Sequence, residues 1–388
     1  MKVSPVLAGM RSYPFLRLTE AKRRLVERGV PVLDFGIGEP REETPAFIRD
    51  ALLASVEKRS TYPATDGLPE LRTAIAGWCD RRFGVALDPD TEVLPTLGSK
   101  EAIFHLAQVV DGDLVAVTTP GYPVAERGAL FAGKAVLELP LRREAGFLPE
   151  LDAVPAATWD RVAILWLNYP NNPTAATAPP GLYERAAALA REHDFVLACD
   201  EDYSELYFGA ERPGSVLQVA DRRNVVALNT LSKRSSMPGY RSGLVAGDRD
   251  VIAALKRYRP NVGVAPQEFV QRAAVAAWGD ENHVEAVRAT YRAKRDVLLP
   301  VLEAHGLRHV GGDATFFLWL DAGLRAEALA QRLLDRGVVL APGSFFGRAG
   351  EGYLRLALVP TLEECRRAAG LLESVVGVQD GVEAGPAA

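Results

Sequence analysis

The sequence is poor in cysteine and histidine. Its 388 residues include three cysteines, Cys79, Cys199 and Cys365, and five dispersed histidines, and none of these is spaced as a metal-ligand set. So few cysteines argue against a disulfide framework and favour a reducing compartment, where the thiols act as small core residues. The sequence therefore predicts a cytoplasmic protein without a metal site.

Long apolar runs and an excess of positive charge are also absent. No stretch is long enough to cross a bilayer, and the N-terminus lacks the charged-then-apolar pattern of a secretory signal. The net charge of −5 argues against a nucleic-acid partner, which requires a basic patch. With 48% apolar and 24% charged residues, the composition is typical of a globular protein. We expect neither a membrane nor a nucleic acid as partner.

What is present is an alternation of short apolar runs with amphipathic helical stretches, from about residue 44 to residue 270. Continuous β-branched and aliphatic runs are typical of buried, mostly parallel strands. We therefore expect an α/β fold with a three-layer α/β/α large domain. The runs predicted to be strands are residues 114–118, 162–167, 196–199, 225–228 and 243–246.

The two ends of the chain have a different pattern. We expect an N-terminal arm, a helix over residues 19–28 ended by Gly29, and a short strand over 32–35. Near the C-terminus we expect a charged helix over 284–302, kinked or shortened at Pro300, and strands over 315–320, 338–340 and 353–358. The predicted division is 1–43 (arm and part of the small domain), 44–280 (large domain), 281–376 (small α+β domain) and 377–388 (flexible tail).

The first segment with chemical potential is Thr230-Leu231-Ser232-Lys233, followed eight residues later by Arg241. It lies just after a predicted strand. A lysine among hydroxyls, with a second cation nearby, fits an anion-binding pocket with a nucleophilic amine, and such an amine forms a Schiff base with an aldehyde. A solvated Lys-Arg loop is the alternative interpretation.

The second segment, Asp200-Glu201-Asp202-Tyr203, also follows a predicted strand. A carboxylate at the carboxyl end of a buried strand lies where open α/β sheets bind ligands. Asp200 could pair with a protonated pyridine nitrogen, and Tyr203 could donate a hydrogen bond to a phenolate. A solvated turn or a metal ligand are the alternatives.

Two further segments each have a structural alternative. Residues 168–174 place asparagines between two prolines, which is a turn signal that could also fix an asparagine amide against a ring oxygen. Gly98-Ser99-Lys100 opens an amphipathic helix, whose free N–H groups can bind phosphate. A simple serine N-cap would explain the second pattern equally well.

Taken together, these segments resemble the fold-type-I aminotransferases of class I. That family carries Asn-Pro-Thr, Asp-x-x-Tyr, Ser-x-Ser-Lys with an arginine eight residues later, and a late substrate-binding arginine. The resemblance runs from about Tyr13 to Leu372. It implies pyridoxal 5′-phosphate as the cofactor, amino acids and 2-oxo acids as substrates, and a homodimer with shared active sites.

The resemblance implies a role for each matching residue. Lys233 forms the Schiff base and shuttles the proton of the substrate α-carbon, and Asp200 keeps the pyridine nitrogen protonated. Around the ring, Asn172 and Tyr203 hydrogen-bond the hydroxyl, while Tyr122 stacks on its face. The phosphate is held by Gly98, Ser99, Lys100 (through its backbone), Ser232 and Arg241, and by Tyr62 of the neighbouring subunit. The substrate carboxylate is bound by Arg355 and by the Gly38 backbone N–H, beside Asn172.

Two positions depart from the family pattern. Thr230 stands where serine is common and keeps the hydroxyl. Ala175 follows Asn172-Pro173-Thr174 where glycine is usual, so we expect the turn there to avoid positive φ.

Within the family, the arm and pocket wall are most similar to N-succinyldiaminopimelate aminotransferases, over residues 13–15, 36–40, 62–65 and 93–102. The resemblance implies N-succinyl-LL-2,6-diaminopimelate as donor and 2-oxoglutarate as acceptor, in lysine biosynthesis. Arg17 is one candidate cation for the distal end of the substrate. A broader aspartate, alanine or aromatic aminotransferase, and a carbon–sulfur β-lyase that shares the same carbanion chemistry, remain open alternatives.

Other function classes fit less well. Gly36-Ile37-Gly38 follows a predicted strand as in nicotinamide enzymes, but Arg41 occupies the place of the third glycine and Pro40 interrupts the helix start. The pair Ser55 and Lys58 matches the Ser-x-x-Lys of β-lactamases without the rest of that site. We also expect no DNA-binding domain of the kind that a cofactor-sensing regulator needs.

Overall fold

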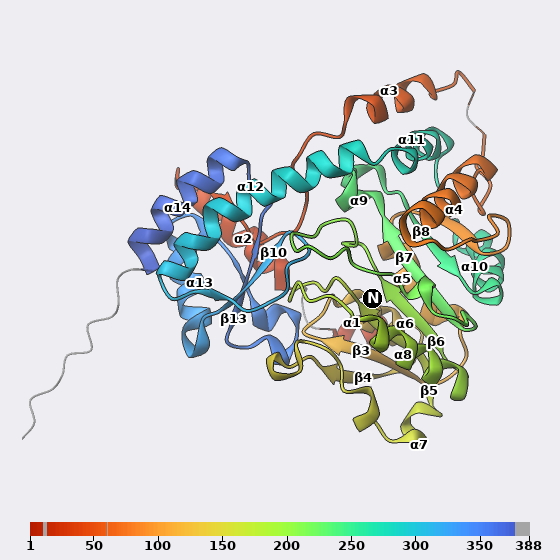
Figure 1. Ribbon diagram of the computed structural model, residues 1–388. Helices are drawn as coiled ribbons and strands as arrows, with labels where there is room; N and C mark the ends of the chain where they lie inside the picture. The colour runs from red at the N-terminus through yellow and green to blue at the C-terminus, as the bar shows by residue number, and fades with distance from the viewer. Residues whose placement is uncertain (11–13, 60, 377–388) are drawn as a thin grey trace, which may run out of the picture.

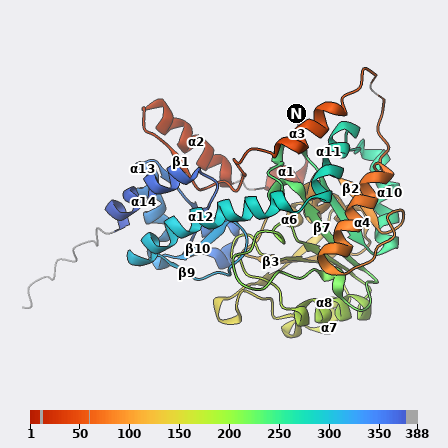
Figure 2. The same ribbon diagram turned by 45° about the horizontal axis from the view of Figure 1, so that its top comes forward.

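The computed structural model describes residues 1–10, 14–59 and 61–376, so the predicted tail 377–388 lies outside the described residues. Two lobes lie side by side, with helix α12 running from one to the other (Figures 1 and 2). The α-helices are α1 Pro5–Gly9, α2 Pro14–Glu27, α3 Ala46–Ala54, α4 Pro69–Phe83, α5 Ser99–Val109, α6 Val124–Phe131, α7 Ala156–Trp159, α8 Pro180–Glu192, α9 Leu231–Arg234, α10 Arg249–Val262, α11 Glu268–Gly279, α12 Asn282–Ala304, α13 Ala326–Asp335 and α14 Leu362–Val376. The strands are β1 Leu33–Asp34, β2 Val93–Thr96, β3 Leu114–Thr119, β4 Ala135–Pro140, β5 Val162–Asn168, β6 Val196–Asp200, β7 Val225–Thr230, β8 Gly243–Gly247, β9 Arg308–His309, β10 Phe317–Asp321, β11 Val338–Val339, β12 Ala341–Pro342 and β13 Tyr353–Ala357.

The larger lobe is built on a seven-stranded sheet in the order β2-β8-β7-β6-β5-β3-β4. Strands β3 to β7 pair in parallel, and β8 runs antiparallel to both of its neighbours. All five predicted strands are present within a few residues of their expected ends. The predicted α/β fold with a mostly parallel sheet is confirmed.

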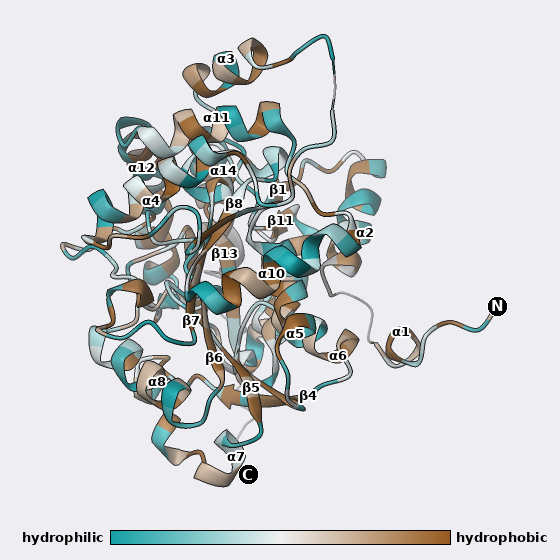
Figure 3. Ribbon diagram, turned by 90° about the vertical axis from the view of Figure 1, so that its right-hand side faces the viewer, coloured by the Kyte–Doolittle hydropathy of each residue, from teal (hydrophilic) through white to brown (hydrophobic). Residues whose placement is uncertain are grey.

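Helices cover both faces of this sheet, as the three-layer prediction requires. Alternate residues of each strand point to opposite faces: Ile164 and Trp166 pack with α5, α6 and α10, whereas Leu165 and Leu167 pack with α4, α8 and α11. Figure 3 shows the hydrophobic strands of this sheet between helices that contain both hydrophilic and hydrophobic residues. The sheet is therefore buried on both faces, which explains its continuous apolar runs.

Local sequence signals set several helix ends. Helix α10 begins after Asp248, whose side chain accepts hydrogen bonds from the backbone N–H groups of residues 250 and 251, and ends at Gly263 with φ of 67°. Helix α4 begins with Pro69 and ends at Gly84, where φ is 69°. These ends follow from residue type alone.

The smaller lobe contains an antiparallel sheet in the order β12-β13-β10-β9, and β1 pairs in parallel with β11. Helices α12, α13 and α14 bury leucines, alanines and Cys365 against these strands. Strand β1 comes from the N-terminal arm, so both ends of the chain contribute to this lobe (Figure 1). The division at residues 43/44 and 280/281 remains a prediction.

Helix α2 begins earlier than predicted, and helix α12 is not shortened at Pro300, which was one of the two outcomes expected there. Helix α2 begins at Pro14 rather than residue 19, because proline suits the first turn of a helix. Helix α12 continues through Pro300 to Ala304. A proline inside a helix costs about 3 kcal/mol, and the burial of Leu298 and Leu302 on either side of it offsets that cost.

The described residues show how the cysteines are placed and what the helices and acidic side chains do not form. All three cysteines are free and buried. No described helix combines the length and apolarity needed to cross a membrane. Within residues 1–10, 14–59 and 61–376, no group of histidine, cysteine and acidic side chains is arranged to hold a metal ion.

Candidate active site

A cavity of about 430 Å³ opens at the carboxyl ends of the parallel strands, with walls from both lobes. Its volume is typical of small-molecule sites, and its position at strand ends is where open α/β sheets bind ligands. Every predicted site residue except Gly98 and Tyr62 lines it. The predicted residues in the lining are Gly38, Ser99, Lys100, Tyr122, Asn172, Asp200, Tyr203, Ser232, Lys233, Arg241 and Arg355.

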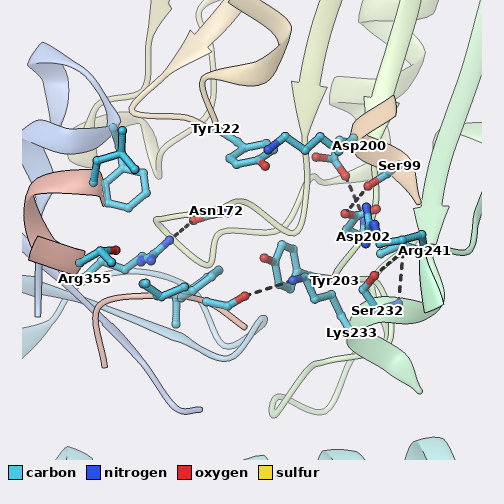
Figure 4. A pocket seen from close by; sticks show the side chains of 18 residues that line it. Ser99, Tyr122, Asn172, Asp200, Asp202, Tyr203, Ser232, Lys233, Arg241 and Arg355 are labelled. Atoms are coloured by element: carbon cyan, nitrogen blue, oxygen red, sulfur yellow. Dashed lines mark hydrogen bonds between the residues drawn. The ribbon is translucent and has the colours of Figure 1, made fainter. Parts of the chain in front are cut away.

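Lys233 lies in the single-turn helix α9, which directly follows β7. The Thr230 side chain caps this turn by accepting a hydrogen bond from the Ser232 backbone N–H at 3.2 Å. The Lys233 Nζ donates to the Gly38 carbonyl at 3.1 Å and points into the cavity (Figure 4). Burial lowers the pKa of Lys233, and the cations Arg241 and Arg355 lower it further, against the opposing effect of the carboxylates of Asp202 and Asp200. A lysine with a lowered pKa is suited to act as a nucleophile or base.

Asp200 is the last residue of β6, and its carboxylate is buried. Burial raises its pKa well above the ordinary range, and the neighbouring carboxylate of Asp202 raises it further. The Asp202 backbone N–H donates to Asp200 Oδ1 at 3.2 Å. A buried carboxyl group of this kind is stabilised by a positively charged ligand atom.

The N-terminus of α5 faces the same cavity. Gly98 has φ of 70°, and a Cβ atom placed there would lie 2.6 Å from Nη2 of Arg241. The backbone of Gly98 therefore packs directly against this guanidinium, which donates to the carbonyls of Leu97 and Pro238 at 3.2 and 2.9 Å. A helix N-terminus beside an arginine is suited to bind a phosphate.

The loop after β5 positions Asn172. Its backbone N–H donates to Asn168 Oδ1 at 2.9 Å. Ala175 has φ of 62°, so the expectation that this turn avoids positive φ was wrong. The Ala175 N–H bonds to the carbonyl of Asn171 at 2.8 Å, and the Asn171 N–H bonds to the carbonyl of Ala176, also at 2.8 Å. These buried bonds outweigh the roughly 1–2 kcal/mol that a left-handed residue costs.

Arg355 projects from β13 into the cavity and is buried. Its two terminal nitrogens donate to Asn172 Oδ1 at 2.9 Å and to the Gly36 carbonyl at 2.7 Å. The guanidinium lies 4.2 Å from the ring centroid of Phe317 and 4.5 Å from that of Phe346. These contacts fix the plane of the guanidinium, as two-pronged carboxylate binding requires.

The aromatic wall comes from different elements. Tyr203 is buried and makes edge contacts with Phe316 and Phe317, each at 5.4 Å between ring centroids, and burial raises its pKa. Tyr122 follows β3, and the Lys100 Nζ lies 6.0 Å from its ring centroid.

Tyr62 lies away from this cavity, and the structure does not describe the side chain of Arg17. The Tyr62 side chain is fully exposed and lies outside the cavity of its own chain, which is compatible with the predicted contact to a second subunit but does not test it. The side chain of Arg17 lies outside what the structure describes.

Sequence reasoning assigned no role to several lining residues: Leu16, Thr19, Ile37, Asp202, Thr230, Phe317 and Phe346. Leu16 and Thr19 come from α2; Leu16 precedes the predicted start of that helix at residue 19, and Thr19 is its predicted first residue. For Asp202, the available signal was a second acid two residues after Asp200. The aromatic pairs at 316–317 and 345–346 were visible, but nothing in the sequence placed them beside Arg355.

These residues fit pyridoxal phosphate. The Gly98 backbone packs against Arg241 at a distance that a side chain would fill, which leaves a cradle for a phosphate beside Ser99 and Ser232. Lys233 would bind the aldehyde carbon, and Asp200 would face the ring nitrogen. The Asp202 Oδ1 atom is buried and accepts no hydrogen bond from an N–H group or a hydroxyl of the described residues, although the Asp200 carboxyl lies close enough to share a proton with Asp202. A buried acceptor of this kind suits a polar ligand.

Comparison with known proteins supports this assignment. The family model "Aminotransferase class I and II" matches residues 30–372. The LL-diaminopimelate aminotransferase of Nitratidesulfovibrio vulgaris (strain DSM 19637 / Miyazaki F) is 40% identical over 368 residues, covering 92% of this chain and 95% of that protein. The solved aspartate aminotransferase from Thermus thermophilus with maleate is 30% identical with a TM-score of 0.87, covering 97% of this chain and 100% of that one. A probable N-succinyldiaminopimelate aminotransferase, also from Thermus thermophilus, is 33% identical with a TM-score of 0.85, covering 93% of this chain and 99% of that one.

Proposed function

The chain belongs to the class I and II aminotransferases, and we propose that its amino donor is N-succinyl-LL-2,6-diaminopimelate and its acceptor 2-oxoglutarate. It is a pyridoxal-phosphate-dependent transaminase of amino acids and 2-oxo acids. The proposal concerns which substrates it prefers and which residues act on them.

The distribution of charge in the cavity carries the choice of donor. The only carboxylates among the described lining residues are Asp200 and Asp202, which are linked by the hydrogen bond from the Asp202 backbone N–H to Asp200 Oδ1. Lys100 supplies a cation beside Tyr122. The other cations of the described lining are already assigned, Lys233 and Arg241 to the cofactor and Arg355 to the substrate α-carboxylate. The Lys100 side chain is therefore the lining cation that remains for the far end of the substrate. Such a wall favours a donor whose far end is anionic, as it is when succinylated.

Two residues act on the substrate in this proposal, Arg355 and Lys233. Bound pyridoxal phosphate supplies an electron sink for the electrons of the substrate Cα–H bond. Arg355 holds the substrate carboxylate with two parallel hydrogen bonds, and the flanking rings of Phe317 and Phe346 keep its plane fixed. The Lys233 Nζ takes the Cα proton and returns it on the cofactor side, a role worth about two to four orders of magnitude in rate.

Around the ring, three residues would hold its charge distribution. Asp200 keeps a proton on the ring nitrogen, because its buried carboxylate gains a cationic partner there. Tyr203 and Asn172 line the cavity where the ring hydroxyl binds. In the second half-reaction, which converts 2-oxoglutarate to glutamate, Lys233 catalyses the same proton transfers in reverse.

A second candidate donor is LL-2,6-diaminopimelate itself. The name of the relative with 40% identity favours it. Its far end carries an ammonium group as well as a carboxylate, and the described cavity wall presents no acid to that ammonium apart from the Asp200 and Asp202 pair. We therefore place the succinylated donor first.

We also propose a homodimer in which Tyr62 reaches the phosphate of the second subunit. The support is that this tyrosine is fully exposed in the single chain although its segment, 62–65, matches the family pattern. Sedimentation equilibrium should give twice the mass of the 42.0 kDa chain. In Tyr62→Phe the affinity for pyridoxal phosphate should fall while the dimer persists, and an unchanged affinity would contradict the shared site.

The test of the donor is a half-reaction followed by cofactor absorbance. Each donor is added alone to the loaded enzyme, and conversion to pyridoxamine phosphate is recorded. We expect fast conversion with N-succinyl-LL-2,6-diaminopimelate and glutamate, and slow conversion with alanine and aspartate. Faster conversion by LL-2,6-diaminopimelate would select the second candidate. Pyruvate released from cystathionine without an acceptor would indicate the β-lyase instead.

A further inference from the structure

The segment after β6 carries a second acid in the cavity, Asp202, two residues beyond Asp200. Its Oδ2 accepts a hydrogen bond from the Ser99 hydroxyl at 2.6 Å (Figure 4). Its backbone N–H donates to Asp200 Oδ1 at 3.2 Å. Asp202 therefore joins the first turn of α5 to the carboxylate at the end of β6, two elements far apart in the sequence.

The bond from Ser99 changes what that residue can offer a phosphate. A serine hydroxyl has one proton, and here Asp202 accepts it. Ser99 then serves the phosphate through its backbone N–H at the start of α5, while its side chain holds Asp202. The sequence analysis expected Ser99 to bind phosphate and gave Asp202 no role.

The second oxygen of Asp202 lies in an unusual environment. Oδ1 is buried and accepts no hydrogen bond from an N–H group or a hydroxyl of the described residues. The carboxyl group of Asp200 lies close enough to share a proton with Asp202. The charged groups that face the carboxylate are Lys233, Arg241 and Asp200. Two carboxylates this close repel one another unless a cation lies beside them. The ring nitrogen of the cofactor, when protonated, is such a cation.

We propose that Asp202 is a positioning residue of the cofactor site. Held by the Ser99 hydroxyl, it fixes Asp200 and adds a second negative charge at the end of the cavity where the ring nitrogen binds. The inference rests on the proposed role of Asp200. Asp202 acts through Asp200 and through its charge, so its effect requires a ring nitrogen that can carry a proton.

That requirement gives a readout independent of turnover. Dissociation constants are measured on the full chain, stripped of cofactor, for pyridoxal phosphate and for its carbocyclic analogue, in which C–H replaces the ring nitrogen. Asp202→Asn keeps an oxygen to accept the Ser99 proton and removes the charge. We expect it to weaken pyridoxal phosphate binding about tenfold or more, the effect of one charge at short range, and to leave the analogue unchanged.

A second variant guards against misfolding of the first. Ser99→Ala keeps the backbone N–H and releases Asp202, so it should weaken pyridoxal phosphate in the same selective way but less strongly. Equal weakening of both ligands by Asp202→Asn, or no weakening of either, would overturn the proposal. If Asp202→Asn does not fold, Ser99→Ala replaces it, and equal weakening of both ligands by Ser99→Ala would overturn the proposal.

Asp200→Asn, measured in parallel, separates the proposed role of Asp202 from the proposed role of Asp200 on which it rests. If Asp200→Asn also fails to distinguish the two ligands, the proposed role of Asp200 is wrong. If Asp200→Asn weakens only pyridoxal phosphate while Asp202→Asn weakens both ligands, only the role of Asp202 is wrong.

Discussion

Replacing Arg355 with lysine tests how the substrate carboxylate is held. The guanidinium donates to Asn172 Oδ1 and to the Gly36 carbonyl through different nitrogens, and it lies between two aromatic rings. A lysine ammonium keeps the positive charge but has neither the planar fork nor the stacked faces. It cannot serve both acceptors and still bind a carboxylate at two points.

The expected magnitude follows from the bond that is lost. A hydrogen bond to a charged group contributes about 1.5–3 kcal/mol. Loss of one of the two bonds to the substrate carboxylate should therefore lower kcat/KM for every donor by roughly 10- to 150-fold. Because Lys233, Asp200 and the phosphate cradle are untouched, the dissociation constant for pyridoxal phosphate should stay unchanged.

The assay measures both quantities in the same preparation. The value of kcat/KM for each donor is measured in the half-reaction, and the dissociation constant for pyridoxal phosphate is measured by fluorescence titration. Arg308→Lys, at an exposed position on β9, serves as the control. If Arg355→Lys retains the parent kcat/KM, the substrate carboxylate binds elsewhere. A fall in cofactor affinity as large as the fall in kcat/KM would refute the separation between the two sites.

Three further predictions follow from groups at the strand ends. Lys233→Ala should abolish steady-state transamination yet still bind cofactor through the phosphate cradle, as absorbance after gel filtration will show; turnover at the parent rate would exclude Lys233 as the base. Asp200→Ala should lose most of its kcat, and unchanged kcat would contradict its place at the ring nitrogen. Burial raises the pKa of Glu201 from 4.5 to about 8, so the folded protein holds a proton that the unfolded chain releases above pH 4.5. The free energy of unfolding in urea should therefore decrease as pH rises from 4.5 to 8, and Glu201→Gln should flatten that decrease.

The strands that carry the site were predictable because they are buried on both faces. Strands β5, β6 and β7 are largely apolar runs that end in Asn168, Asp200 and Thr230. A polar residue at the end of such a run marks the sheet edge where ligands bind. The site could therefore be assembled from sequence wherever it lies on a strand end.

Strand β4 and the direction of β8 escaped prediction for physical reasons. Strand β4 lies at the edge of the sheet and is mostly exposed, so Ala135–Pro140 shows no continuous apolar run. Strand β8 is fully buried whichever way it runs, and burial alone carries no information on direction. The direction of β8 is known from its antiparallel pairing with β7.

The contacts between distant segments could not be predicted from the sequence either. The bond between Ser99 and Asp202 spans 103 positions, and that between Arg355 and Asn172 spans 183. Each requires the relative placement of two elements. Sequence patterns identified all four residues or their segments, but not which of them touch.

Gly98 is a position where sequence and structure agree on a residue for testable reasons. Its φ of 70° favours glycine, and a Cβ there would meet Arg241 at 2.6 Å. Gly84, at the end of α4, has φ of 69° and no atom within 4 Å of a Cβ. The two glycines share a positive φ but differ in ψ, which is 169° at Gly98 and 27° at Gly84. Gly98 therefore lies in a region that is almost restricted to glycine, whereas Gly84 is in the left-handed helical region that other residues can adopt.

Gly84→Ala is therefore a control for the effect of a positive φ alone. It should lose about 1 kcal/mol of unfolding free energy, because alanine resists a left-handed conformation, and Gly98→Ala should lose more, about 1–3 kcal/mol, because of its ψ. Only Gly98→Ala should displace the guanidinium and weaken pyridoxal phosphate, by roughly 10- to 150-fold if one charge-assisted hydrogen bond is lost. Pyridoxal, which has no phosphate, should bind both variants equally. If Gly98→Ala binds pyridoxal phosphate as tightly as Gly84→Ala does, the packing of Arg241 against Gly98 does not shape the phosphate site.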